Sequence, residues 1–103
     1  MKTINNITVI CFDNEGETFD RYSVLYLDLI IHPDFPCHKM YIGMSSNPFH
    51  PQGFAQHGEM QLTKMEINRL KNGKNALPHW GKLIDFDALP IDCQRCVIGD
   101  LES

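Results

Sequence analysis

Two runs rich in β-branched and aromatic residues, joined by a short acidic turn, constrain the fold of this chain most strongly. The first run, Ile7–Phe12, reads ITVICF, and the second, Thr18–Ile31, is rich in Phe, Tyr, Val, Leu and Ile. Such residues favour β-strands. Asp13–Gly16, DNEG, lies between the runs and is typical of a turn. We therefore predict an antiparallel hairpin that nucleates a sheet.

Further strands are expected on both sides of the chain's centre. The link HPDFPCH contains two prolines and predicts a turn, after which Lys39–Met44 is expected to pair with the far half of the second run. Lys82–Phe86, KLIDF, predicts a further short strand. Neither face of Thr18–Ile31 is purely polar.

Two helices are predicted from their caps and periodicity. Thr63 and Glu66 have capping-box spacing, and Gly73 supplies a left-handed stop for a helix within Leu62–Gly73. A final helix is expected to begin near Pro90, with an apolar stripe at Leu89, Cys93, Cys96 and Val97. The order of elements indicates one α+β domain over residues 1–103. Its mainly antiparallel sheet, of about four strands, would be covered on one face by the two short helices.

The segment Tyr41–Glu59, YIGMSSNPFHPQGFAQHGE, shows no sustained helix or strand period. Irregular segments of this length are usually functional or disordered, and the large apolar side chains argue against a simple linker, so we predict a shaped loop that forms the working surface. Proline-braced aromatics can anchor a protein partner, although they can also fold inward as the loop's own small core. The partner-binding candidates are Asn47, Phe49, His50, Gln52, Phe54, Gln56, His57 and, beside the loop, Trp80.

Charge and the N-terminal sequence narrow the partner classes. Nine Lys and Arg against thirteen Asp and Glu give a net charge of -4, which argues against direct nucleic-acid binding. MKTINNITVI lacks the apolar core of a secretory signal, and no stretch approaches the length of a membrane span. We expect a cytoplasmic protein without a membrane partner, and hence reduced cysteines.

Two groups of residues raise the question of metal or enzymatic chemistry. Cys93 and Cys96 have CxxC spacing, and Cys37 with His38 would complete a zinc set, but both CxxC cysteines fall on the predicted apolar stripe. We therefore predict buried thiols, no metal and no cofactor. His50, His57 and His79 with Glu59 suit a small metal- or histidine-dependent enzyme if they converge; otherwise their rings hold the loop through backbone hydrogen bonds. No catalytic residue is assigned.

Several short motifs resemble a family of small phage, prophage and other mobile-element proteins. They are Gly43-Met44-Ser45, Asn47-Pro48-Phe49, Pro51-Gln52-Gly53-Phe54 and Gln56, then His79, Gly81-Lys82, Ile84, Leu89-Pro90 and Gln94. The resemblance covers about a third of the chain and implies no established activity. It implies an accessory protein that binds a host protein or complex, such as an inhibitor of a CRISPR effector or another defence system.

Three hypotheses follow. The leading one is a protein-binding module, in the cytoplasm of the host cell, that uses the loop and Trp80. The second is the histidine-based enzyme. The third is a homodimer joined through an exposed edge of the long second strand.

Overall fold

The computed structural model describes residues 2–102 and shows a single α+β domain built on one antiparallel sheet. The strands are β1 (Lys2–Ile4), β2 (Ile7–Asp13), β3 (Tyr22–Tyr26), β4 (His38–Met44), β5 (Ala55–Gln61) and β6 (Lys82–Ile84). The helices are α1 (Lys64–Lys71) and α2 (Ile91–Glu102), with short 3-10 turns η1 (Pro78–Trp80) and η2 (Phe86–Ala88). The α+β class predicted from the sequence is confirmed.

The sheet has the order β1-β2-β3-β4-β5, and β6 also pairs with β2. β1 is opposite Ile7–Val9 and β6 is opposite Cys11–Asp13, so these two short strands follow one another along the outer edge of β2. β3 lies between β2 and β4. Both edges of that strand are therefore paired within the chain, so it offers no exposed edge for the predicted homodimer; the homodimer itself stays a prediction.

Both predicted hairpin partners of the second strand are confirmed, but that strand is shorter than expected. β2 and β4 each pair antiparallel with β3. Residues 14–21 form a loop instead of extending the strand, because polar side chains bond within it: Asn14 Nδ2 donates to Thr18 Oγ1 at 2.8 Å and Thr18 Oγ1 donates to Asp20 Oδ1 at 2.6 Å. Such local side-chain bonds compete with strand pairing.

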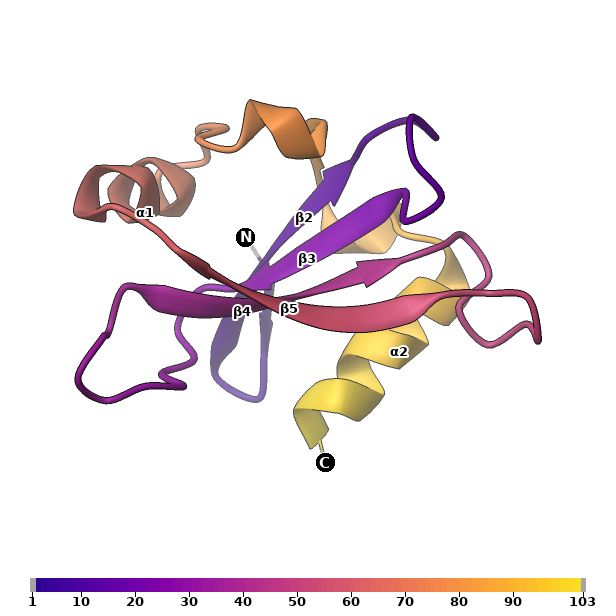
Figure 1. Ribbon diagram of the computed structural model, residues 1–103, viewed down its shortest axis with the longest axis horizontal. Coiled ribbons are helices and arrows are strands. Elements are labelled where there is room, and N and C mark those ends of the chain that lie inside the picture. The colour runs from indigo at the N-terminus through magenta and orange to yellow at the C-terminus, as the bar shows by residue number, and fades with distance from the viewer. Residues whose placement is uncertain (1, 103) are drawn as a thin grey trace.

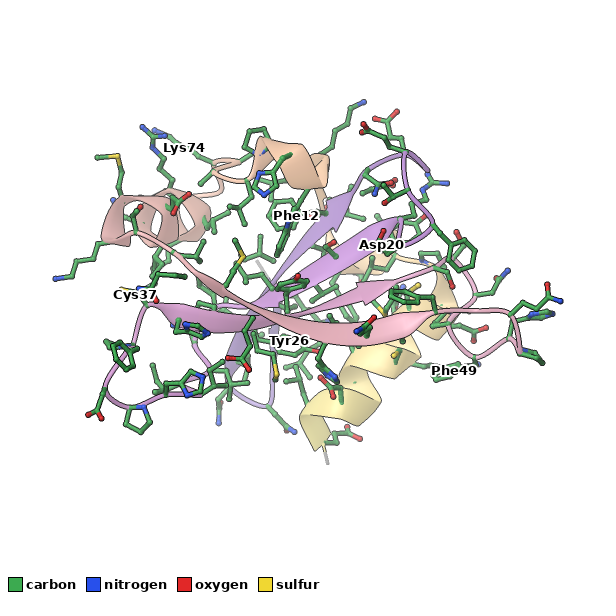
Figure 2. All side chains as sticks on the ribbon, viewed as in Figure 1. Phe12, Asp20, Tyr26, Cys37, Phe49 and Lys74 are labelled. Atoms are coloured by element: carbon green, nitrogen blue, oxygen red, sulfur yellow. The ribbon has the colours of Figure 1, made fainter. Side chains whose placement is uncertain are left out.

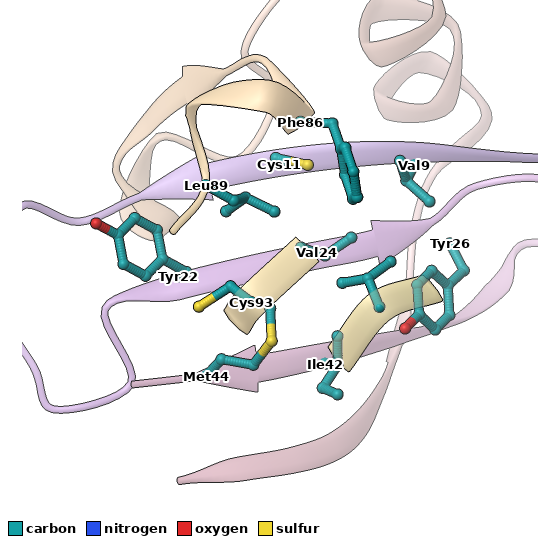
Figure 3. Packing of buried hydrophobic residues seen from close by; sticks show 11 residues of the cluster. Val9, Cys11, Tyr22, Val24, Tyr26, Ile42, Met44, Phe86, Leu89 and Cys93 are labelled. Carbon is teal, nitrogen blue, oxygen red and sulfur yellow. The ribbon is translucent and has the colours of Figure 1, made fainter. Parts of the chain in front are cut away.

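Helices cover both faces of the sheet, which corrects the prediction of a single covered face. α1 and η1 lie above the sheet in Figure 1, and α2 lies below it. The alternation of β2 explains this arrangement: Val9 and Cys11 point to the α2 side, whereas Ile10 and Phe12 point to the α1 side. Figure 3 shows the core on the α2 side, where Cys93 and Leu89 pack over β2, β3 and β4.

The two predicted helices are confirmed with their caps. Thr63 is the N-cap of α1, both capping-box hydrogen bonds with Glu66 are present, and Gly73 follows with a φ of 74°. α2 begins one residue after Pro90 and buries Cys93 and Val97. Within residues 2–102, no helix has the length and apolar character that crossing a membrane requires.

Candidate functional site

A cleft of about 680 Å³ lies between the β2–β3 loop and the β4–β5 loop, at one end of the sheet. Both loops are at the right-hand end in Figure 1, and Figure 2 labels Asp20 and Phe49 there. The lining residues are Gly16, Glu17, Thr18, Phe19, Arg21, Ser45, Ser46, Asn47, His50, Gln52 and Gly53. The cleft therefore includes three of the predicted partner-binding residues, Asn47, His50 and Gln52.

The β4–β5 loop, residues 45–54, is a shaped loop as predicted, but it is shorter than Tyr41–Glu59. Its neck is closed by Ser45 N–H donating to the Phe54 carbonyl and by Phe54 N–H donating to Ser45 Oγ, both at 2.9 Å. Two consecutive turns follow inside, from His50 N–H to the Asn47 carbonyl and from Gly53 N–H to the His50 carbonyl. A Cβ on Gly53 would lie 1.9 Å from the Asn47 carbonyl oxygen, so only glycine fits that turn.

Residues on either side of the loop belong to strands. Tyr41–Met44 is the end of β4, and residues 55–59, which the sequence predicts as loop, pair with β4 as part of β5. Gln56 and His57 are therefore exposed residues of a strand that pairs, among the described residues, with β4 alone.

Three phenylalanines belong to the two loops that form the cleft, and Phe19 is one of its lining residues. Phe49 is 60% exposed, so the alternative in which it folds inward does not apply to it. Phe54 is half-buried, and its ring lies edge-on to Phe19 with 6.4 Å between centroids. Phe19 is itself 66% exposed. Sequence reasoning missed Phe19 because it assigned the residue to the second strand. We call the cleft, together with Phe19, Phe49 and Phe54 of its two loops, the two-loop surface.

Of the two charged residues that line the cleft, Glu17 and Arg21, the arginine is paired with a carboxylate. Arg21 donates from Nε and a terminal nitrogen to both carboxylate oxygens of Asp13, at 2.7 and 3.1 Å. This hydrogen bonding holds the pKa of Asp13 below its ordinary value. His50 is the imidazole among the lining residues, and its Nδ1 accepts the Gln52 N–H at 3.1 Å. Among the described lining residues, no hydrogen bond joins this imidazole to a serine or threonine hydroxyl.

Trp80 lies in the core on the α1 side and is half-buried. Its ring centroid is 5.3 Å from that of Phe12 and 4.7 Å from that of Tyr41. Among the described residues, its ring-to-ring contacts are with Phe12, Tyr41 and His79, none of which belongs to the 45–54 loop. A partner-binding role for Trp80 stays a prediction, and we leave it out of the two-loop surface.

The histidines predicted as an enzymatic group do not converge. His57 Nε2 lies 2.9 Å from Asp100 Oδ1 of α2, and the His79 ring lies beside that of Trp80. His50 Nδ1 accepts a hydrogen bond from the Gln52 N–H within its own loop. Glu59 contacts none of these rings and instead contacts His32 and His38, at 2.8 and 2.9 Å. The predicted set of His50, His57, His79 and Glu59 is therefore wrong as a site.

The CxxC cysteines behave as core residues. Cys93 is fully buried, its Sγ donates to the Ser45 carbonyl at 3.3 Å, and burial raises its pKa to about 12. Burial also raises the pKa of the half-buried Cys96. Through this hydrogen bond, Cys93 of α2 stabilises the start of the 45–54 loop.

One group of three potential metal ligands occurs within residues 2–102, and it consists of His32, His38 and Glu59. It lies at the end of the sheet opposite the two-loop surface, because His38 begins β4 and the 45–54 loop follows the end of that strand. Figure 2 labels the neighbouring residue Cys37. The zinc set suggested by the cysteines does not form in the described chain. The sequence feature that could have indicated this group is the pair of histidines, His32 and His38, that begin and end the HPDFPCH link.

Comparison of the chain with protein-family models, curated proteins and solved structures found no match.

Proposed function

We propose that this chain is a non-enzymatic protein-binding domain whose contact region is the two-loop surface. The observation that carries the proposal is the exposure of Phe19 and Phe49, 66% and 60%, on the two loops that form a cleft of about 680 Å³. Aromatic side chains that project beside a cleft can each bury about 150–250 Å² in a partner, and such anchors dominate interface energies.

The surroundings of these rings support the same proposal. Asn47, Gln52 and Thr18 line the cleft with neutral polar groups, which suit the hydrogen-bonding rim of an interface. The 45–54 loop is held by backbone and side-chain hydrogen bonds across its neck and within its turns. A loop ordered in advance loses less conformational entropy when it binds, so its aromatic anchors contribute more of their burial energy to affinity.

The finer proposal concerns the partner. The resemblance of Gly43–Gln56 to phage and mobile-element proteins supports a host protein or complex, such as a component of a defence system, met in the cytoplasm of the host cell. The net charge of -4 supports a protein partner rather than a nucleic acid.

The experiment is affinity capture from lysate of the organism that harbours the chain, followed by measurement of affinity for the captured protein. Phe19→Ala and Phe49→Ala are compared with Phe35→Ala, a matched control that is 63% exposed in the loop before β4, at the other end of that strand. We expect a captured protein whose affinity falls at least about tenfold in the first two variants and is unchanged in the third. Circular dichroism confirms that all three are folded.

An equal loss of affinity for the captured protein in all three variants, or no loss of affinity in any, would show that the two-loop surface is not the contact region. A captured protein that depends on Phe35 alone would move the interface to the opposite end of the sheet.

A further inference from the structure

His32, His38 and Glu59 come from three segments and meet at one point. His32 lies in the loop between β3 and β4, His38 is the first residue of β4, and Glu59 is in β5. Met40 is opposite Glu59 in the β4–β5 register. His38, two residues before Met40, is therefore the diagonal neighbour of Glu59 on the same face of the antiparallel pair. The two imidazole Nε2 atoms lie 2.8 and 2.9 Å from the same oxygen, Glu59 Oε1.

From this geometry we propose that His32, His38 and Glu59 bind one zinc ion and leave at least one coordination position for water. The three ligand atoms lie within 4.8 Å of one another. Two imidazole nitrogens and a carboxylate oxygen are ligands that Zn²⁺ takes readily, and three protein ligands leave the fourth tetrahedral position open. Calcium and magnesium prefer all-oxygen sites, so this donor set selects against them.

The ligands have room to adopt zinc geometry. Tetrahedral coordination with bonds near 2.0–2.1 Å separates neighbouring ligand atoms by roughly 3.3 Å, about half an ångström more than the two nitrogen–oxygen distances here. Such a shift is small for these side chains, because that of His32 is 48% exposed and that of Glu59 50%. His38, at 29%, is the most buried of the three and is the fixed ligand.

The hydrogen bonds around His38 favour an ion at Nε2. Two acceptors face this ring: Glu59 Oε1 at Nε2, and Gln61 Oε1 at Nδ1, 3.4 Å away. A neutral imidazole has one N–H, so it satisfies one of these acceptors only. With zinc at Nε2 the proton sits on Nδ1 and is donated to Gln61, the outer-shell arrangement typical of zinc-bound histidine.

The backbone before β4 also holds His32 in place. Phe35 N–H donates to the His32 carbonyl at 2.9 Å, and His38 N–H donates to the Phe35 carbonyl at 3.0 Å. Two successive turns therefore connect the two histidines, and Pro33 and Pro36 restrict the chain between them. Zinc at this point would tie the β3–β4 loop to the edge strand β5.

The test is titration of the tag-free, chelator-treated protein with zinc chloride at neutral pH, by isothermal calorimetry. We expect one ion per chain and a loss of affinity of at least about tenfold in Glu59→Gln and in His38→Gln. His57→Gln is the matched control, because His57 lies on the same strand and face as Glu59 and its side chain is 47% exposed, close to His32. The control should bind zinc as tightly as the wild type.

A second measurement needs no variant. NMR of the wild-type imidazoles during the same titration should show the nitrogen signals of His32 and His38 changing together, with those of His50 and His79 unchanged. Binding no tighter than about 100 µM, or equal weakening by all histidine variants, would overturn the proposal, because it would indicate adventitious surface binding. Unchanged affinity in Glu59→Gln would overturn it too. If the three side chains form only an imidazolium–carboxylate contact that does not bind zinc, the calorimetric titration will give no heat and the NMR signals will not change. That result would also overturn the proposal.

Discussion

At the scale of single residues, Gly58 in β5 carries a steric requirement set by its cross-strand neighbour. The ring of Tyr41 lies over it, so that a Cβ at this position would be 2.5 Å from the ring. Tyr41 also packs on Trp80 and cannot move away without losing that contact. We predict that Gly58→Ala lowers the free energy of unfolding by about 1–3 kcal/mol, measured by urea denaturation.

Gly99→Ala is the control for this substitution. Gly99 lies within α2, and a Cβ there meets no atom within 4 Å. Alanine should raise stability by up to about 1 kcal/mol through its better helix propensity. Equal stability of Gly58→Ala and the wild type would show that the Tyr41 ring does not constrain position 58.

The cysteines should differ sharply in reactivity. Burial raises the pKa of Cys11 and of Cys93 to about 12, far above neutral pH, so almost none of either is the reactive thiolate. Cys37 is half-buried in the turn before β4. We predict that iodoacetamide modifies Cys37 first and modifies Cys11 and Cys93 only after unfolding, as mass spectrometry of peptides would show. Rapid labelling of Cys93 in the native protein would contradict its assignment as a core residue.

Several residue-level features could be predicted because they depend on short sequence spacing. The capping box of Thr63 and Glu66 and the buried position of Cys93 are confirmed. The meeting of His32 and Glu59 could not be predicted, since it depends on the register between β4 and β5. Local spacing brings His57 and Glu59 onto one face, but only the fold shows that they face different partners.

At the scale of elements, β5 was missed for a physical reason. Its sequence, AQHGEMQ, has no β-branched residue and includes a glycine, and β-propensity therefore gives no signal. The strand forms because β4 offers seven paired residues to its backbone. The unpredicted strand changes the expected loop only in part, because most of the partner-binding candidates lie in residues 45–54, which remain irregular in the structure.

The salt bridge that closes the β2–β3 loop predicts a pH dependence. The Arg21 hydrogen bond lowers the pKa of Asp13 below 3.8, so the ionised carboxylate stabilises the fold above that pH. The contribution is lost as pH falls through the lowered pKa. We predict that Arg21→Gln slightly lowers the urea midpoint at neutral pH and that its difference from the wild type vanishes well below pH 3.8. Urea midpoints at the two pH values measure this, and a constant difference would contradict it.

Asp100 attaches α2 to two strands. Tyr26 Oη donates to its Oδ2 at 2.6 Å, and His57 Nε2 lies 2.9 Å from its Oδ1. Asp100→Asn places an amide N–H₂ against one of these donors, and we predict a loss of about 1–3 kcal/mol in urea denaturation. Arg95→Gln removes only an exposed contact with Asp92 and should change stability by no more than about 0.5 kcal/mol. Equal effects would show that α2 does not depend on the Asp100 contacts.

At the scale of the whole molecule, one sheet separates two cores. The sequence already held a sign of this, because neither face of the second strand is polar: Val24 and Tyr26 are buried on the α2 side and Leu25 and Leu27 on the α1 side. A sheet strand with two apolar faces needs cover on both. The prediction of one covered face was wrong because spacing within α1 and α2 does not show on which side of the sheet each helix packs.

Because β2 and β3 contribute to both cores, we predict that the two layers unfold together. Trp80, the single tryptophan, reports on the α1 side, whereas Val97 is fully buried on the α2 side. Val97→Ala should cost about 1–3 kcal/mol and should shift the urea midpoint of Trp80 fluorescence as far as that of far-UV circular dichroism. Leu70→Ala, on the α1 side, serves as the reciprocal variant and should also move both signals together. If Val97→Ala shifts the circular dichroism and leaves the Trp80 midpoint in place, the α1 layer is stable without the α2 layer. The shared strands would then fail to couple the two cores, and the two faces of the sheet would have separable stabilities.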